Sequence, residues 1–219
     1  MKRNNFLIFF FFPLLFLGQY NDAGLWLNAN VEKKLLKDLS VSFNPTVRFN
    51  ENVTELGQWF LDQGLSYKLN KRLRVSVNYR YSQKRKLDDT YANRHRFYAD
   101  LTYKMKLGKI ALSYRLRGQD QYAEIYSREK GRTPSMAIRN KLQAKYASDT
   151  KFEPFLSAEL WYGITNKISQ FNNVRVVGGT DYELNKYSSI TLSYIFQKEF
   201  AVKNPETDFI FSLGYNYSF

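Results

Sequence analysis

The chain has 219 residues, enough for one domain with a substantial core. Its 33 Lys and Arg exceed its 20 Asp and Glu, giving a formal charge of +13, and its 17 Tyr and 18 Phe argue against a disordered chain. The sequence has no cysteine, which excludes disulfides, cysteine-ligated zinc and a lipoprotein anchor, and its single histidine, His95, excludes a multi-histidine metal site. We therefore expect no cofactor and no metal.

The N-terminal segment predicts a secretory signal peptide. Two basic residues precede an apolar run of 12 residues, Phe6–Leu17, which is too short to span a membrane and is followed by polar sequence. We place cleavage near residues 18–20, so that residues 1–19 are the signal peptide and residues 20–219 are one mature barrel domain. Export from the cytoplasm argues against a nucleic-acid partner, which the basic and aromatic composition would otherwise suggest.

From residue 23 to the C-terminus, apolar and polar residues alternate with the period of a β-strand. In the last segment, for example, every odd-numbered residue from Phe209 to Phe219 is apolar or aromatic. At ~3.3 Å per residue and a tilt of ~45°, segments of this length cross the ~25 Å apolar band of an outer membrane. The expected strands, in chain order, are 23–33, 38–49, 57–69, 73–83, 94–107, 110–121, 137–146, 152–164, 174–184, 188–200 and 208–219.

Short and long connections between these strands alternate along the chain, beginning with the short 34–37 and the longer 50–56. This pattern predicts short periplasmic turns and longer extracellular loops, as in transmembrane barrels. We therefore expect an all-β fold, a transmembrane antiparallel up-and-down β-barrel of 10–12 strands. A soluble sandwich or lipocalin-like barrel is the alternative, but the strand length, the signal peptide and the terminal Phe219 favour the transmembrane form.

The strand count leaves one topological question open. If the short turns are periplasmic, the strand at 23–33 must begin on the extracellular side, whereas bacterial barrels usually have an even number of strands with both ends inside. Three explanations remain at this point. The first segment is not a simple strand, it crosses the lumen, or the count is wrong by one.

Several motifs resemble those of a known family. They are Gly24–Trp26, Asn93–Phe97, Arg139–Leu142, Glu153–Glu159, Asn173–Arg175, Gly179 and Phe219. In these positions the chain resembles a family of uncharacterised outer-membrane β-barrels, catalogued as a domain of unknown function and common in Bacteroidetes-type bacteria. The resemblance implies the barrel fold and a location in the outer membrane of a Gram-negative bacterium, and it implies no activity.

The expected location suggests several partners. The outer face would contact outer-membrane lipid and lipopolysaccharide, and the strand ending at Phe219 would be the assembly signal read by the barrel assembly machinery. Small anionic solutes and an unidentified envelope protein are the other partners that we consider.

If the apolar face of each strand contacts lipid, the polar face lines the lumen. Counted over all strands, this parity places 14 basic and eight acidic residues inside, an excess of six positive charges. The basic residues that we expect to line the lumen include Arg48, Arg74, Arg80, Arg94, Arg96, Arg115, Arg117, Arg139, Lys141 and Arg175. The acids that we expect to form ion pairs with them are Glu153, Glu159 and Asp181.

These lumen charges support two hypotheses. Most directly, the protein is a small passive porin-like channel whose arginine-rich lumen prefers anionic solutes. Alternatively, the charges pair across strands and the barrel is closed and non-conducting, a structural or accessory subunit of an envelope complex.

A lipid-modifying enzyme is the weakest hypothesis. His95 faces outward near the extracellular rim, but the outward residue two positions on is Phe97, and the nearby Ser82 faces inward. A nucleophile needs its base within hydrogen-bonding reach. We therefore expect no enzymatic activity.

Overall fold

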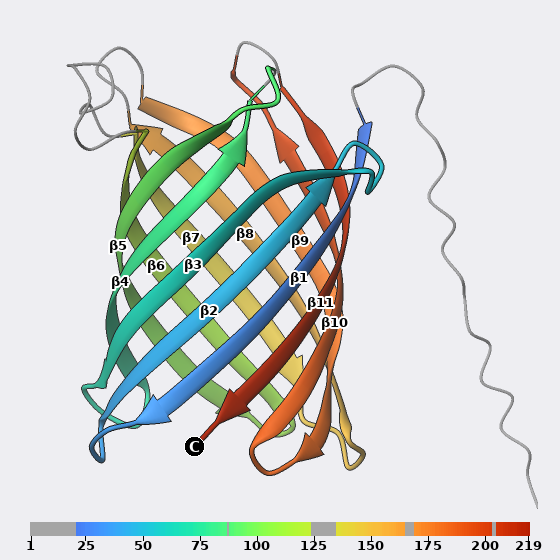
Figure 1. The fold of residues 1–219 in the computed structure, drawn as a ribbon. Coiled ribbons are helices and arrows are strands. Elements are labelled where there is room, and N and C mark those ends of the chain that lie inside the picture. Colours follow the sequence, from blue (N-terminus) through green and yellow to red (C-terminus); the bar gives the residue numbers. More distant parts are fainter. Residues whose placement is uncertain (1–20, 87, 124–134, 165–168, 203–204) are drawn as a thin grey trace, which may run out of the picture.

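The computed structural model describes residues 21–86, 88–123, 135–164, 169–202 and 205–219. These residues form eleven β-strands that close into one barrel (Figure 1). The strands are β1 (Asn21–Lys34), β2 (Leu39–Asn50), β3 (Glu55–Lys68), β4 (Leu73–Arg85), β5 (Tyr91–Leu107), β6 (Ile110–Tyr122), β7 (Ser135–Tyr146), β8 (Phe152–Ile164), β9 (Ser169–Asn185), β10 (Ser188–Glu199) and β11 (Thr207–Ser218). The described residues include no helix long and apolar enough to cross a membrane. The signal peptide predicted at residues 1–19 lies outside the described residues.

The barrel confirms the predicted fold class, and each predicted strand corresponds to an observed one. The main difference is at the strand ends next to the longer loops, where β5 starts at Tyr91 and β9 starts at Ser169. The sequence predicted starts at residues 94 and 174 because alternation weakens there. Pairing extends these strands past that point, since β9 remains paired with β8 up to Ser169.

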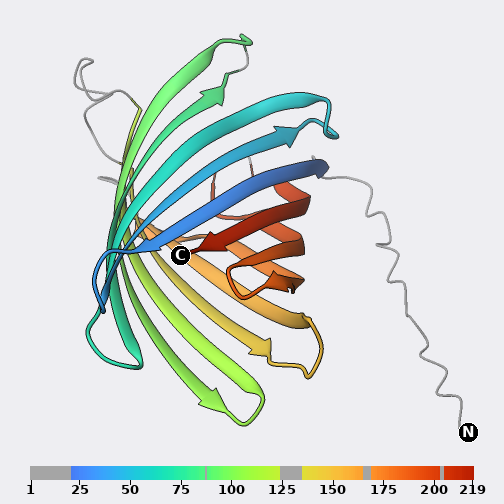
Figure 2. The ribbon, with the colours of Figure 1, turned by 60° about the horizontal axis from the view of Figure 1, so that its bottom comes forward.

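The barrel closes through a parallel pair of strands, which corrects the expectation of a wholly antiparallel sheet. Every pair of strands adjacent in sequence is antiparallel, but β1 and β11 pair in parallel from Asn21↔Thr207 to Glu32↔Ser218. The parallel seam answers the open question about strand number. With eleven strands, β1 and β11 run in the same direction, and both end at the rim that carries the short turns (Figures 1 and 2).

The seam is joined along its whole length. Twelve consecutive residue pairs align across it, and near the short-turn rim the Phe219 amide donates to the Glu32 carbonyl oxygen at 3.0 Å. The Lys34 amide donates in turn to the Phe219 carbonyl oxygen at 3.0 Å. Each described strand is therefore paired on both edges, as a barrel in an apolar environment requires.

The two faces of the sheet reverse the usual arrangement of a soluble protein. Large apolar side chains point outward and are exposed, with Phe211 at 64% and Leu156 at 61% exposure. The most buried side chains include charged ones on the inner face, with Arg139 and Glu159 each at 5%. An apolar outer surface around a charged interior is the pattern of a transmembrane barrel.

The parallel seam can be tested with an engineered disulfide, because the natural chain has no cysteine. Leu27 and Leu213 are direct partners across the seam, so Leu27→Cys with Leu213→Cys should form a disulfide in the refolded barrel. The measurement is the shift in electrophoretic mobility on oxidation. Leu27→Cys with Tyr217→Cys is the matched control, because four positions along β11 move the partner by ~13 Å. Cross-linking of the control pair in preference to the first would refute this register.

Candidate functional site

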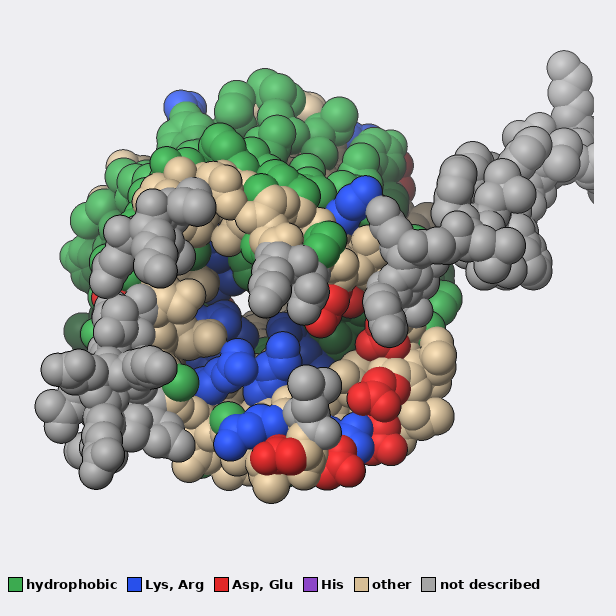
Figure 3. Space-filling view, turned by 90° about the horizontal axis from the view of Figure 1, so that it is seen from above, with side chains coloured by type: hydrophobic (Ala, Val, Ile, Leu, Met, Phe, Trp, Pro, Cys, Tyr) green, Lys and Arg blue, Asp and Glu red, His purple; other side chains and the backbone are tan. Residues whose placement is uncertain are grey.

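A belt of arginines lines the lumen in the half of the barrel nearer the longer loops. Figure 3 looks into this mouth and shows Lys and Arg side chains gathered in its hollow, with Asp and Glu along one side of the rim. Each belt arginine lies closer to the long-loop end of its strand than to the other end. The arginine belt consists of Arg48, Arg80, Arg96, Arg117, Arg139 and Arg175.

Aromatic rings on the inner face separate the belt arginines on one side of the lumen. The Arg48 guanidinium lies 3.7 Å from the centre of the Trp26 ring and 4.8 Å from that of Phe60. The Arg80 guanidinium also lies against Phe60, 3.7 Å from the centre of its ring. Such stacking holds each planar guanidinium against the wall through cation–π attraction and keeps neighbouring cations apart.

The stacked series continues across the parallel seam. Arg139 lies 4.0 Å from the Trp161 ring, and Arg175 lies 5.2 Å from that ring and 5.0 Å from Trp26. Because Arg175 is on β9 and Trp26 is on β1, this contact passes over β10 and β11. The belt therefore connects the two ends of the sheet from the inside.

Three carboxylates neutralise part of the belt. Asp62 accepts from the Arg80 Nε at 2.9 Å and from the Tyr98 hydroxyl at 2.9 Å. Asp100 accepts from the Arg117 Nε at 2.7 Å. The third carboxylate is Glu159.

Glu159 joins three strands. It accepts from Arg139 Nη2 at 2.7 Å and from Arg115 Nη2 at 2.5 Å, and its side chain is only 4% exposed. Arg139 and Arg115 lie on β7 and β6, so a single buried acid on β8 binds cations from two other strands. Burial removes the hydration of these charges, and the ion pairs and hydrogen bonds between them offset that loss.

The other three belt arginines donate to glutamine amides. Arg48 reaches Gln58 Oε1 at 3.4 Å, and its buried Nε has no described hydrogen-bond partner. The Arg96 Nε donates to Gln121 Oε1 at 3.0 Å. Gln197 accepts from the Arg175 Nε at 2.9 Å, and Arg175 also forms a long ion pair with Glu159, at 4.0 Å. A neutral amide satisfies a guanidinium without cancelling its charge, so the belt retains a positive excess.

The lumen charges are divided between two walls. On strands β2–β7, the basic wall, acidic residues on the inner face are confined to Asp62 and Asp100 in the described part of the chain. The inner-face basic residues of this wall are Arg48, Lys68, Arg74, Arg80, Lys84, Arg94, Arg96, Lys104, Lys106, Arg115, Arg117, Arg139, Lys141 and Lys145.

Strands β8–β11 together with β1 form the acidic wall. Among the described residues, its inner-face cations are Arg175 and, at the last position of β1, Lys34. Its inner-face acids are Asp22, Glu32, Glu153, Glu159, Asp181, Glu183, Glu199 and Asp208.

The structure places the basic and acidic residues expected from sequence on the inner face, and several of them meet. Lys145 bridges Glu153 at 2.9 Å and Asp181 at 2.5 Å, and Arg74 lies 3.7 Å from Glu32. Arg94 and Lys141 face the lumen with no ion pair to a described residue.

Sequence parity missed two groups of lumen residues. The inner-face aromatic residues of the belt occupy positions where alternation predicts polar side chains, and this break in the pattern is the signal that could have found them. Four charged residues close to strand ends were also omitted, and because two are basic and two acidic, the excess of six is unchanged. They are Lys34, Lys84, Asp22 and Asp208.

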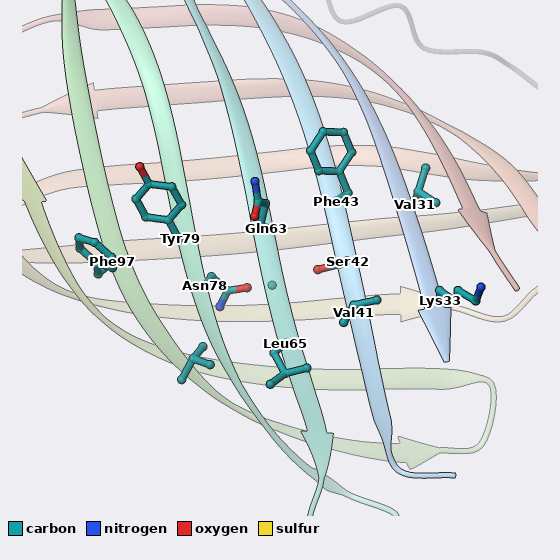
Figure 4. Close-up of a pocket in the computed structure, with 12 residues that line it drawn as sticks. Val31, Lys33, Val41, Ser42, Phe43, Gln63, Leu65, Asn78, Tyr79 and Phe97 are labelled. Atoms are coloured by element: carbon teal, nitrogen blue, oxygen red, sulfur yellow. The ribbon is translucent and has the colours of Figure 1, made fainter. Parts of the chain in front are cut away.

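Two features lie on the outer face. His95 faces outward, where its Nδ1 lies 2.7 Å from the Tyr79 hydroxyl oxygen and its ring packs edge-on against Tyr81. A hollow of about 640 Å³ lies across β1–β5, and outward side chains such as Phe43 and Leu65 form its walls (Figure 4). Neither feature contributes to the lumen.

The closed barrel, apolar outer band and charged interior define the class as an outer-membrane-type β-barrel. The sequence profile described as "Protein of unknown function (DUF2490)" matches residues 23–208. The chain belongs to this family, which confirms the resemblance to a barrel family of unknown function. No curated protein matches the sequence.

Three solved structures align with the chain at low sequence identity. The β domain of the Bordetella autotransporter BrkA aligns with a TM-score of 0.50 and 12% identity over 85% of this chain and 86% of that one. An anion-selective porin from Comamonas acidovorans aligns with a TM-score of 0.40 and 12% identity over 83% of this chain and 53% of that one. Outer-membrane-expressed OmpT of Vibrio cholerae aligns with a TM-score of 0.40 and 10% identity over 74% of this chain and 54% of that one. Likeness at this level concerns the fold alone.

The role of Glu159 gives a stability prediction. Glu159→Gln should lower the free energy of unfolding by about 3 kcal/mol, because it leaves buried arginines without their counter-ion. Glu153→Gln is the matched control. Its side chain is 24% exposed and pairs with Lys145, so its cost should stay below about 1 kcal/mol. Urea unfolding of each refolded variant in lipid vesicles, followed by tryptophan fluorescence, measures the two changes in the free energy of unfolding. Equal effects of the two substitutions would contradict this account.

Proposed function

We propose that the protein is a narrow passive channel in the outer membrane of a Gram-negative bacterium and that it prefers small anionic solutes. The observation that carries this proposal is that Arg48 and Arg96 donate to glutamine and have no carboxylate partner in the described part of the chain. Arg175 likewise donates to Gln197, and its ion pair with Glu159 is long, at 4.0 Å. A belt built only to hold the wall together would be more stable with its charges neutralised. Keeping the positive charge in a low-dielectric lumen raises the local concentration of anions.

The dimensions of the barrel support a narrow pore. Side chains just fill a barrel of about eight strands, and a wide aqueous channel forms at about 16–18 strands. Eleven strands lie between these limits. Stacking on Trp26, Phe60 and Trp161 holds belt guanidinium groups beside aromatic rings of the wall, where their remaining N–H groups can bind carboxylate or phosphate oxygens.

A closed barrel is the second candidate, and specific contacts favour it. Ion pairs connect strands that are not neighbours, such as Arg115 on β6 with Glu159 on β8, and Arg74 on β4 with Glu32 on β1. Such bridges could fill the lumen and make the barrel a structural or accessory subunit of an envelope complex. This form predicts no conductance and stable co-purification with a partner.

The proposed orientation puts the longer loops outside the cell and the short turns in the periplasm. The outer face would then contact lipid and lipopolysaccharide, and β11 together with the Phe219 that follows it would be the part read by the assembly machinery. No enzymatic step is included in this proposal. We therefore expect neither the natural protein nor the His95→Ala variant to deacylate lipids.

Cysteine labelling tests the orientation. In intact cells, a membrane-impermeant maleimide should label Asn52→Cys, which lies in the loop between β2 and β3. Lys71→Cys, in the short turn between β3 and β4, should be labelled only after the outer membrane is permeabilised. The cysteine-free natural chain provides the background. The reverse labelling pattern would invert the proposed topology.

Conductance tests the channel itself. In a planar bilayer under a KCl gradient, the refolded barrel should give discrete steps whose reversal potential indicates preference for chloride. The double variant Arg48→Gln and Arg96→Gln removes two charges that have no carboxylate partner, and it should reduce the chloride-to-potassium permeability ratio by roughly threefold to tenfold. High salt should weaken the preference in the natural protein as well.

The matched control removes two positive charges outside the lumen, with Lys109→Gln in a turn and Lys198→Gln on the outer face of β10. Its permeability ratio should equal that of the natural chain. A correctly folded but silent barrel would instead support the closed form, and unchanged selectivity in the Arg48 and Arg96 variant would show that the belt does not select ions.

A further inference from the structure

Opposite charges face each other across the lumen. The basic wall, β2–β7, is one continuous part of the sheet, and the acidic wall, β8–β11 with β1, is the rest of it. The division extends over the height of the barrel. On the acidic wall Asp208 lies near the long-loop rim and Glu183 near the short-turn rim, while Lys84 and Lys104 occupy the corresponding ends of the basic wall.

Ion pairs cancel much of this charge where the two walls meet. At the junction of β7 and β8, Arg139 binds Glu159 and Lys145 binds Glu153. Away from this junction, Arg96 and Lys104 on the basic wall have no ion pair within 4.0 Å in the described part of the chain. The same is true of Glu183 and Asp208 on the acidic wall, as far as the described residues extend. The charges left over therefore produce an electric field directed from one wall to the other, in addition to the net positive potential.

We propose that the natural solutes of this lumen carry both charges, with a carboxylate or phosphate at one end and an ammonium group at the other, as in short peptides. This inference rests on the proposed channel and refines its substrate class. A transverse field aligns a molecule that has separated charges, so its anionic end lies against the arginine belt and its cationic end against the opposite carboxylates. Both ends then gain attraction, whereas a simple anion is attracted by one wall and repelled by the other.

The distribution of charge along the height of the lumen fits the same solute class. Arg175 is the belt arginine on the acidic wall, where it stacks between Trp26 and Trp161. At the level of the belt the lumen therefore presents guanidinium groups from both walls, and towards both rims it presents opposite charges. A dipolar molecule would enter in this alignment and pass its anionic group along the arginine belt. Beyond the belt, its cationic group would again contact the carboxylates of the acidic wall.

Proteoliposome swelling tests the inference. Triglycine, a zwitterion, is compared with N-acetylglycylglycinamide, an uncharged molecule of similar size, in vesicles containing the refolded full-length barrel. Triglycine should enter several-fold faster. Chloride conductance is measured on the same preparation, so a barrel that does not conduct refutes the channel itself and this inference with it. Conductance without faster entry of triglycine, including exclusion of both molecules, refutes only the inference.

Neutralising the acidic wall isolates the field from the anion preference. Glu183→Gln, Glu199→Gln and Asp208→Asn together should abolish the advantage of triglycine while chloride conductance persists. The matched control, Asp38→Asn, Asp88→Asn and Asp149→Asn, removes three acids from turns and loops and should retain that advantage. Retention of the advantage in the acidic-wall variant would overturn the proposal, and so would its loss in the control.

Discussion

Closure of the sheet is the constraint on which the rest of this structure depends. In an apolar environment every strand must find hydrogen-bond partners on both edges, because an unpaired edge has no water to satisfy it. Eleven strands can meet this requirement only if the first and last run in the same direction. Because strand directions alternate along the chain, an odd number of strands makes β1 and β11 pair in parallel. This pairing determines which side chains meet inside, including the contact of Arg175 with Trp26 across the seam.

The interior solves the problem of placing many cations close together by three means. Aromatic rings separate stacked guanidinium groups, carboxylates such as Glu159 neutralise some of them, and glutamine amides satisfy others without neutralising them. The first two stabilise the wall, whereas the third leaves positive charge in the lumen. The balance between pairing and leaving charge free is what separates a closed scaffold from a selective channel, and it is set residue by residue along the belt.

Period-two alternation was enough to predict the barrel, its strands and most charged residues of its inner face, because the outer apolar face imposes strict parity. It could not predict the parallel seam, since alternation carries no information about which edges meet. Parity does place Trp26, Phe60 and Trp161 on the inner face, but it could not predict that they stack on arginines, because stacking depends on contacts between strands. The two charged walls were available in the sequence, but they became visible only once strand order was known.

The parallel seam also separates the two ends of the barrel. Asn21 lies at the long-loop rim and Phe219 at the short-turn rim, so polypeptide attached ahead of β1 and polypeptide attached after β11 would emerge at opposite rims of the barrel. A barrel with an even number of strands returns both ends to one compartment. The odd number of strands therefore gives this barrel a built-in polarity, with one end of the chain at each rim.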